Sequence, residues 1–344
     1  MSTNLPGNEC EGKTCLVEVK DGGLALRQHM FQKGMAKLES LVALENVKKQ
    51  IYNLVCRLTV ERQANVLGIK KADVPSHHMV FMGNPGVGKT ETARCIPEIF
   101  FGIGITKSPS FIEANRGDLV GEFIGHTEKK TRELVEKAVS SGGVLFVDEF
   151  HQLGADDSSR DFGKKSIGIF VSSLENYRDK FVCIVAGYPE EMRKTISSDP
   201  GLQSRFSTYI NFPSYTTEEM LQIFEFYCNK NNHFIEELEN TQIGQSKRDL
   251  IKHGITTLVN EFKEIGNGRA IRKLFEKAEQ IQSIRLYKKY FLDGLNCVSN
   301  EKFLYDYAVF DVEDIRLALL ELRSELLQMQ EAKEGKTMGF KFDN

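Results

Sequence analysis

A glycine-rich run in the first third of the chain constrains the fold more than any other feature. The run fits the pattern G-x-x-x-x-G-K-[ST] and consists of Gly83, Asn84, Pro85, Gly86, Val87, Gly88, Lys89 and Thr90. A short apolar run at residues 79–82 precedes it, and a segment that we predict to be helical follows at residues 91–100. A strand before this motif and a helix after it form the context in which it binds phosphate. The sequence therefore predicts a phosphate-binding loop.

The residue types of this loop fit the chemistry of a nucleoside triphosphate with Mg²⁺. Glycines let backbone N–H groups turn inward around an anion, and the start of the following helix adds partial positive charge. Lys89 can reach the β- and γ-phosphates, and the Thr90 hydroxyl can bind Mg²⁺. We include the next residue, Glu91, in the predicted nucleotide site. A glycine-rich turn formed by chance is the alternative, and the flanking strand and helix argue against it.

A second motif at residues 144–149, VLFVDE, narrows the reaction. It reads as an apolar strand that ends in two carboxylates, Asp148 and Glu149. We expect Asp148 to hold the Mg²⁺ shell and Glu149 to act as the general base that polarises a water molecule. An ordinary acidic turn after a strand is the alternative. Because a small-molecule kinase does not need the second acid, the pair favours nucleotide hydrolysis.

Short apolar runs alternate with helical segments over the middle of the chain. The runs lie at residues 79–82, 111–114, 144–147, 181–186 and 209–212. Continuous apolar runs of this length suit strands that are buried on both faces, and strand–helix alternation implies a parallel sheet covered by helices. The predicted fold is α/β, with a parallel five-stranded sheet and helices on both faces. After Pro213 the pattern turns helical, at residues 216 or 217 to 228, 249–262, 269–287 and 312–329.

Composition sets limits on the class of protein. The chain has 344 residues, enough for about two domains, and 45 basic against 48 acidic residues give a net charge of −3. This charge offers no overall attraction to nucleic acid, and no apolar stretch is long enough to span a membrane. The start of the chain lacks the apolar core of a secretory signal, and the 7 cysteines form no C-x-x-C pair. We expect a cytoplasmic protein that binds neither nucleic acid nor membrane.

These patterns divide the chain into four parts. Residues 1–38 form an N-terminal leader, in which residues 15–19 alternate like a short strand and residues 21–23 form a turn. Residues 39–213 form the α/β nucleotide-binding domain, and residues 214–330 form an α-helical domain. A polar insert at residues 229–249 holds a loop, and residues 331–344 form a loose tail. We expect the apolar stripe of residues 312–329 to pack against the helical domain, with a partner helix as the alternative.

Taken with GEFIGHT at residues 121–127 and VAGYP at residues 185–189, the two motifs resemble those of AAA+ ATPases. Within that family they resemble the subgroup of red-type Rubisco activase and stage V sporulation protein K, over residues 41–278. The resemblance implies an α/β domain followed by a helical lid, with ATP and Mg²⁺ bound between them. It also implies a hexameric ring with each ATP at a subunit boundary. Val42 and Ala43 would lie against the adenine; the family usually has glycine where Ala43 stands.

The resemblance also implies roles for arginines and a tyrosine. Arg205 would be the arginine finger that reaches a neighbour's γ-phosphate, with a solvated surface arginine as the alternative. Arg269 would be the sensor 2 residue of the lid, and Arg272 is the second candidate for that role. The alternative is that both arginines lie on a solvated helix face. Tyr188 stands at the sensor 1 position, where many family members have asparagine.

Phe123 would line a central pore and grip a polypeptide, and a Phe123 packed inside the domain is the alternative. Residues 155–165 would form a second pore loop. The function predicted on these grounds is an ATP-hydrolysing enzyme that does conformational work on a protein client of unknown identity. A nucleotide-gated scaffold with slow ATPase is one alternative, and a DNA-acting AAA+ protein, which the charge disfavours, is the other.

Overall fold

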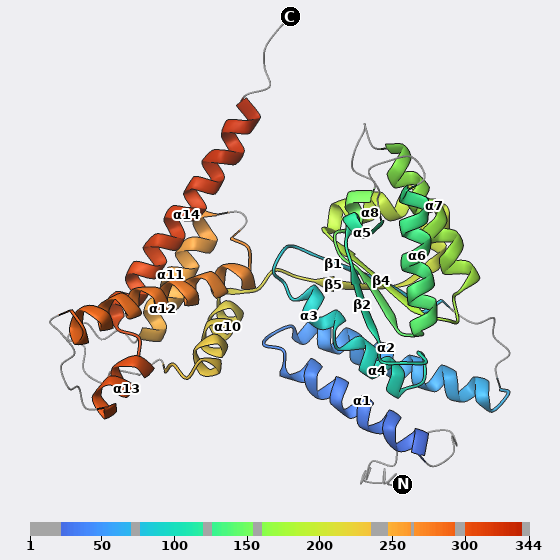
Figure 1. Cartoon of the computed structure of the whole chain (residues 1–344), viewed down its shortest axis with the longest axis horizontal. Helices are drawn as coiled ribbons and strands as arrows, with labels where there is room; N and C mark the ends of the chain where they lie inside the picture. The colour runs from blue at the N-terminus through green and yellow to red at the C-terminus, as the bar shows by residue number, and fades with distance from the viewer. Residues whose placement is uncertain are drawn as a thin grey trace, which may run out of the picture.

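Two lobes make up the described part of the chain, an α/β lobe and a helical lobe joined by the segment that follows the last strand (Figure 1). The computed structural model describes residues 22–69, 76–119, 126–153, 160–234, 247–262, 265–292 and 300–338. None of the helices within these ranges is long and apolar enough to cross a membrane.

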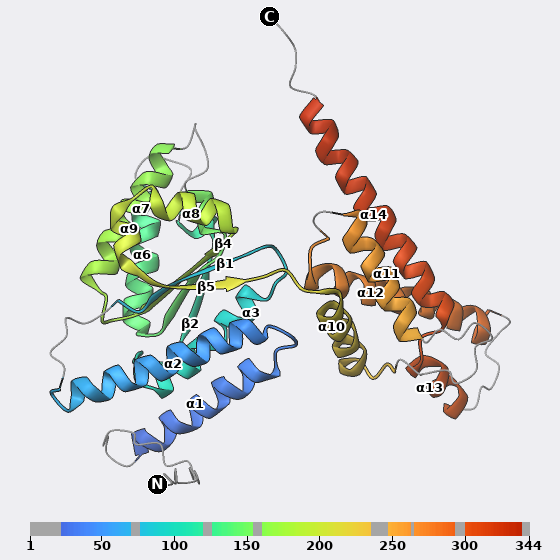
Figure 2. The ribbon, with the colours of Figure 1, turned by 180° about the vertical axis from the view of Figure 1, so that it is seen from behind.

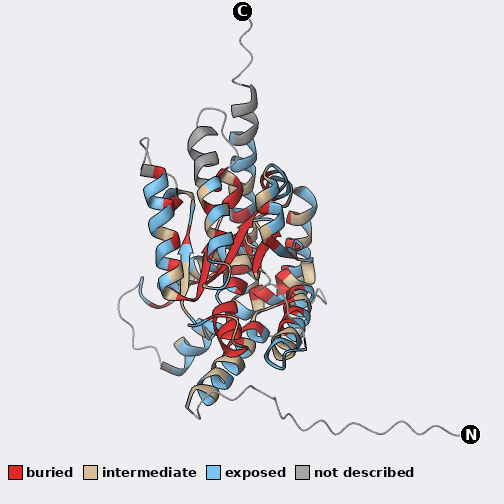
Figure 3. Cartoon of the chain, turned by 90° about the vertical axis from the view of Figure 1, so that its right-hand side faces the viewer, coloured by how far each residue is buried: buried red, intermediate tan, exposed pale blue. Residues whose placement is uncertain are grey.

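The α/β lobe is built on a parallel sheet of five strands, as predicted. The strands are β1 (His78–Gly83), β2 (Phe111–Ala114), β3 (Val144–Val147), β4 (Val182–Gly187) and β5 (Phe206–Phe212). Their order across the sheet is β2-β3-β4-β1-β5, and every neighbouring pair is parallel. Every residue of β1, β3 and β4 is buried, because helices cover both faces (Figure 3).

Two hydrophobic layers sandwich this sheet. Met79 and Phe81 of β1 face α2 (Glu45–Val66) and α4 (Ile96–Gly102), whereas Val80 faces the opposite layer. Successive residues of a strand point to opposite faces, which explains the division. The second layer is formed by α6 (His126–Ser141), α7 (Arg160–Asn176), α8 (Pro189–Ser197) and α9 (Pro200–Arg205), seen from behind in Figure 2. Two short elements, α5 (Arg116–Leu119) and the 3₁₀ turn η1 (Phe150–Leu153), follow β2 and β3.

The strand order places the glycine-rich loop at the point where the chain reverses its direction of travel across the sheet. The chain leaves β1 toward β2 at one edge, but it leaves β4 toward β5 at the other edge. Ligands of open α/β sheets bind beyond the carboxyl ends of the strands at such a reversal. The loop begins at the carboxyl end of β1, so the fold itself selects this position for a ligand.

The helix predicted for residues 91–100 is in fact divided in two, α3 (Lys89–Ala93) and α4. The amide of Cys95 bonds to the carbonyl of Thr92 rather than continuing the α-helical ladder. Pro97, in the first turn of α4, has no N–H and so suits a helix start better than a helix interior.

The predicted turn at residues 21–23 is wrong, because helix α1 (Gly22–Ser40) begins there. This helix packs closely on α4: a Cβ on Gly102 would lie 2.5 Å from the Cβ of Phe31. Lys33 and Lys37 of α1 both form ion pairs with the buried Glu98 of α4. The leader therefore includes a helix that is held by contacts distant in sequence. The strand predicted at residues 15–19 lies outside the described residues.

The helical lobe consists of α10 (Thr217–Lys230), α11 (Lys247–Glu261), α12 (Gly268–Tyr290), α13 (Asn300–Ala308) and α14 (Val312–Met338). Thr216 caps α10, and its side chain exchanges hydrogen bonds with Glu219 in a capping box. Of the apolar stripe on α14, Ile315 and Leu322 are buried in the core of this lobe, whereas Met329 is half exposed. Helix α14 extends to Met338, so residues 331–338 are helical rather than loose.

Candidate active site

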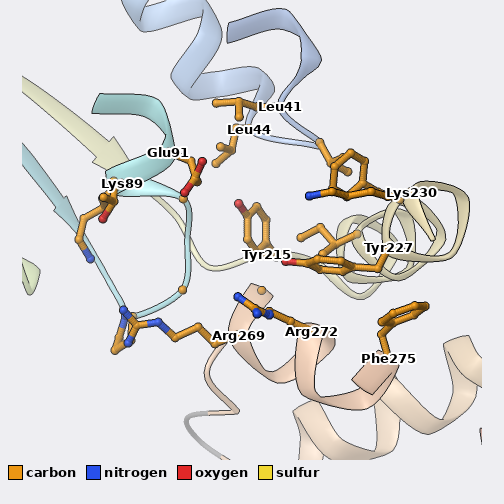
Figure 4. Close-up of a pocket in the computed structure, with 18 of the residues that line it drawn as sticks. Leu41, Leu44, Lys89, Glu91, Tyr215, Tyr227, Lys230, Arg269, Arg272 and Phe275 are labelled. Carbon is orange, nitrogen blue, oxygen red and sulfur yellow. The ribbon is translucent and has the colours of Figure 1, made fainter. Parts of the chain in front are cut away.

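A cavity of about 770 Å³ lies between the two lobes at the carboxyl end of β1. Its volume falls in the range of typical ligand sites. The α/β lobe contributes the glycine-rich loop and the two acidic residues after β3. The helical lobe contributes an aromatic and basic wall. Figure 4 shows Lys89 and Arg269 on the loop side of the cavity, and Tyr227, Lys230 and Phe275 on the far side.

The loop backbone depends on two glycines in left-handed conformations. Gly86 has φ 74° and Gly88 has φ 87°, values that residues with a Cβ rarely adopt. A Cβ on Gly86 would also lie 2.3 Å from the carbonyl oxygen of Gly266 in the segment before α12. The Gly268 amide donates to the Gly86 carbonyl at 3.0 Å. The loop and the helical lobe therefore meet backbone to backbone at Gly86.

Lys89 is held over the loop by backbone carbonyl groups. Its Nζ donates to the carbonyl oxygens of Gly83 at 2.7 Å and Asn84 at 2.9 Å. Burial lowers the pKa of Lys89 below its usual value; the nearby Asp148 and Glu149 oppose this shift, and Arg269 adds to it. A half-buried ammonium group beside a guanidinium attracts an anion such as a triphosphate strongly.

Thr90 and Asp148, the two predicted Mg²⁺ ligands, meet beside the cavity. The Thr90 hydroxyl lies 3.4 Å from a carboxylate oxygen of Asp148, although the two residues are 58 positions apart in the chain. A hydroxyl and a carboxylate suit Mg²⁺, which prefers oxygen ligands and retains several waters. The residues present therefore fit the expected metal ion.

Glu149 follows directly and has an unusual backbone. Its φ is 52°, which places a non-glycine residue in the left-handed region. Its Oε2 accepts a hydrogen bond from the Gln152 side chain and lies 3.9 Å from Nε2 of His151. Strained backbone of this kind gathers at functional sites. The carboxylate is thus oriented by its neighbours beside the cavity, where a general base is expected.

At the other end of the cavity the segment before α2 contributes apolar side chains. Leu41, Val42 and Leu44 line the cavity, whereas the predicted Ala43 is buried behind them. Ala43 has φ 59° and Leu44 has φ 66°, so two consecutive residues adopt the conformation that glycine favours. This finding explains why glycine would suit position 43.

Several cavity residues were not predicted. Tyr215, Phe226, Tyr227 and Phe275 form the aromatic part of the wall. The Phe226-Tyr227 pair stands on α10 where part of each ring stays exposed, and Tyr215 follows the last strand. Aromatic residues just beyond the carboxyl edge of a sheet are a weak signal, because most aromatic residues belong to a core.

Of the predicted loop residues, Val87 is fully buried under the loop and Asn84 donates to the Ser214 hydroxyl at 3.1 Å. Glu91 lines the cavity.

Asn267 joins the helical lobe to the loop. Its side chain donates to the Pro85 carbonyl at 3.2 Å and accepts from the Tyr215 amide at 3.1 Å. Two residues further along the chain, Arg269 extends toward the loop (Figure 4). Arg272 lines the same cavity and is paired with Glu276 at 2.8 Å. Both candidates for the sensor 2 role are therefore brought to the cavity.

Tyr188 lies at the carboxyl end of β4, just before α8. Its ring centre is 6.0 Å from Nζ of Lys89 and 4.8 Å from the ring centre of His151. The residue is next to the loop lysine, but it is set back behind the cavity surface.

Arg205 is far from the loop of its own chain. It ends α9, and the next residue, Phe206, pairs with His78 at the start of β1. Phe212, at the other end of β5, pairs with Gly83. The length of β5 thus separates Arg205 from the loop by about 20 Å. Phe123 and residues 154–159 lie outside the described residues, and residues 160–165 belong to α7, not to a loop.

Comparison with known proteins agrees with this geometry. Residues 79–214 match the family described as "ATPase family associated with various cellular activities (AAA)", and residues 216–324 match the AAA lid domain. Stage V sporulation protein K of Bacillus subtilis is 36% identical over 269 residues, which are 76% of this chain and 80% of that protein. The chloroplastic ribulose bisphosphate carboxylase/oxygenase activase of Cyanidioschyzon merolae is 34% identical over 76% of this chain and 85% of its own.

Protein CfxQ of Xanthobacter flavus is 32% identical over 83% of this chain and 85% of its own. Among solved structures, the FIGL-1 AAA domain in complex with ADP superposes with a TM-score of 0.53 at 18% identity, over 86% of this chain and 89% of that one. This last similarity shows the fold alone.

Proposed function

Because the chain belongs to the AAA ATPase family, we propose that it hydrolyses ATP with Mg²⁺ and couples the reaction to remodelling of a protein client. The observation that carries this proposal is the convergence of Lys89, the Thr90–Asp148 pair and Glu149 in one cavity that the helical lobe closes. The relatives of this chain include an activase, which supports the proposal that ATP hydrolysis drives conformational work on another protein.

Each residue has a separate part in the proposed reaction. Thr90 and Asp148 would hold Mg²⁺, which would neutralise negative charge on the triphosphate. Lys89 exchanges its backbone carbonyl partners for phosphate oxygens. Glu149 accepts a proton from the attacking water. Arg269 brings positive charge from the lid to the same phosphates, so nucleotide occupancy is linked to the position of the helical lobe.

We propose that Arg205 acts on the ATP of an adjoining copy, because it lies at the end of β5 that is remote from the phosphate loop of its own chain. A homo-oligomer, hexameric by analogy with the family, follows from that role. Residues 39–213 would be the nucleotide-binding unit and residues 214–330 the lid. Phe123 would contact the client at a pore, and the client itself is unidentified. The cytoplasm remains the predicted location.

The test compares the wild-type protein with Glu149→Gln. Wild type should release phosphate from Mg·ATP, whereas Glu149→Gln should bind ATP equally well and hydrolyse it about 10²–10⁴-fold more slowly. ATP binding by wild type without phosphate release would instead favour a nucleotide-gated scaffold. Stimulation of the ATPase by DNA but by no protein would favour a DNA-acting enzyme.

The client can be sought with the same variant. Glu149→Gln loaded with ATP should retain its client in a native lysate, because the ATP-bound state persists. Lys89→Ala is the matched control, since its weaker ATP binding should leave that state less populated. A protein captured by the first variant and not by the second is the candidate client. Equal capture by both would argue against ATP-dependent engagement.

A further inference from the structure

His151, two residues beyond Glu149, occupies a position that the reaction described above does not use. It stands on η1, and its side chain is only 7% exposed. Its Nε2 faces Oε2 of Glu149 at 3.9 Å. Its Nδ1 lies against Gly187 at the end of β4, where a Cβ would be 2.4 Å away. The imidazole therefore fills the space between the ends of β3 and β4, and Gly187 has to be small to admit it.

The ring of His151 also packs on Tyr188, with ring centres 4.8 Å apart. Tyr188 in turn lies beside Lys89. The four side chains form one continuous row behind the cavity, from the phosphate-binding lysine to the water-activating carboxylate. A row of this kind is the contact path by which a residue at the end of β4 can influence Glu149.

The protonation state of His151 can be assigned from its surroundings. Burial lowers its pKa below the usual value, against the opposing effects of Glu149, Glu191 and Asp148, and Lys89 adds to the lowering. A neutral imidazole carries one N–H. Nδ1 is buried and has no hydrogen-bond partner among the described residues, so the proton is best placed on Nε2, facing the carboxylate.

Gln152, the next residue, donates to the same oxygen, Oε2 of Glu149. Two successive residues of η1 thus direct donors at one carboxylate oxygen, which leaves Oε1 for the attacking water. The separation of 3.9 Å exceeds a direct hydrogen bond, and catalytic contacts of this kind often shorten only when substrate is bound.

We propose that His151 is a positioning residue that links Tyr188 to Glu149 and holds the carboxylate in the orientation needed to activate water. The proposal rests on the proposed ATPase function. It assigns Tyr188 an indirect role, in which the tyrosine acts on Glu149 through the imidazole of His151. An asparagine at the sensor 1 position would instead be expected to contact the attacking water directly.

The competing explanation is that His151 is simply a buried, packed ring, and the helical lobe offers a matched control for it. His233 is also buried, its Nδ1 also has no hydrogen-bond partner among the described residues, and its Nε2 lies 3.3 Å from Glu279. It stacks on Phe310 with ring centres 4.5 Å apart. His233→Phe therefore imposes the same chemical change on a comparable environment in the other lobe.

The experiment measures kcat and KM for ATP by phosphate release. His151→Phe keeps an aromatic ring and its packing but removes the Nε2 donor. We expect kcat to fall about tenfold or more, because general acid–base catalysis contributes about 10²–10⁴ to the rate. KM should change less than about twofold. His151→Gln retains an N–H donor at a similar reach and should recover most of kcat. His233→Phe should leave both constants unchanged. A wild-type kcat in His151→Phe, or equal losses in His151→Phe and His151→Gln, would overturn the proposal.

Binding of a non-hydrolysable ATP analogue reports whether each variant is folded. If His151→Phe does not fold, Gly187→Ala provides the second test, because its Cβ displaces the imidazole and should lower kcat without raising KM. An unchanged kcat in that variant would count against the proposal. Failure of the proposed ATPase function itself is distinguishable, because wild type would then bind ATP without releasing phosphate, whatever the His151 variants do.

Discussion

Nε of Arg205 lies 2.8 Å from a carboxylate oxygen of Glu175, so the expected arginine finger is ion-paired within its own chain. Glu175 belongs to α7 and Arg205 ends α9, and the two helices pack together. The Arg205 side chain also donates to the Ser204 hydroxyl and is 27% exposed. These contacts restrict the side chain to few rotamers, which lowers the entropic cost of presenting it to a partner.

Arg205→Ala should lower ATP turnover by about 10³–10⁵-fold, because the transition-state charge in the neighbouring site is left unmatched. Mixing this variant with Lys89→Ala subunits should restore part of the activity. Lys89→Ala subunits cannot use their own site, but they can still donate Arg205. Phosphate release by the mixture is compared with that of each variant alone. No recovery, with assembly intact by light scattering, would identify Arg205 as a structural residue.

Lys89→Ala should weaken ATP binding about 10- to 100-fold, since one charge-assisted hydrogen bond contributes about 1.5–3 kcal/mol. A fluorescent ATP analogue measures the affinity by titration. Lys194→Ala on α8 removes an exposed lysine and serves as the control. Equal affinity in the two variants would be inconsistent with the assignment of the phosphate loop.

Asn267→Gly should loosen the connection between the lobes. Glycine tolerates the φ of 51° at this position but removes the side-chain bonds to Pro85 and Tyr215. Because the helical lobe supplies much of the cavity wall, we expect ATP affinity to fall by about tenfold, equivalent to about 1.4 kcal/mol. Isothermal titration calorimetry provides the affinity. If affinity is retained, the bonds of Asn267 serve folding rather than lid closure.

Ala43→Gly should stabilise the protein by about 0.5–1 kcal/mol. The left-handed conformation costs a residue with a Cβ about 1–2 kcal/mol, and glycine removes this cost. The greater conformational freedom of glycine in the unfolded chain offsets part of the stabilisation. Ala64→Gly within α2 is the control of opposite sign, with an expected loss of about 1 kcal/mol. Urea unfolding measures both. Destabilisation by Ala43→Gly would show that packing of the Ala43 methyl group stabilises the protein by more than the left-handed backbone conformation costs.

His78 should make stability depend on pH. It is fully buried in β1; the Cys183 amide donates to its Nδ1 at 3.0 Å, and its Nε2 lies 3.3 Å from the Leu174 carbonyl. Burial lowers its pKa to about 4, so the native state keeps it neutral where the unfolded chain, with a pKa near 6.5, is protonated. Stability is therefore complete above pH 6.5 and declines as the pH falls toward 4, by up to about 3 kcal/mol.

The measurement for His78 is the free energy of unfolding in urea between pH 7.5 and 4.5, for wild type and His78→Phe. The variant loses the bond to Cys183 at every pH, but it should show a shallower decline in acid. The difference between the two proteins should therefore shrink as the pH falls. Parallel curves would mean that His78 does not supply the acid sensitivity.

The sequence by itself determined the parts of this protein that depend on local spacing. The phosphate loop was predictable from Gly86, Gly88 and Lys89, because phosphate binding needs those residue types in that order. Asp148 and Glu149 were recognisable because an apolar strand buried on both faces ends directly before them. Burial on both faces also made β1 and β4 predictable, whereas β2 and β5 are only partly buried and were predicted from their apolar runs alone.

Tertiary structure alone decided the features that depend on contacts between distant segments. A turn was predicted at residues 21–23, where helix α1 begins with two glycines, yet packing on α4 and the pairing of its lysines with the buried Glu98 stabilise this helix. The aromatic wall of the cavity requires the helical lobe to meet the loop at Gly86. The placement of His151 against Gly187 requires two strand ends to lie side by side. Spacing along the chain carries no information about such contacts, because they form only when the lobes and layers pack together.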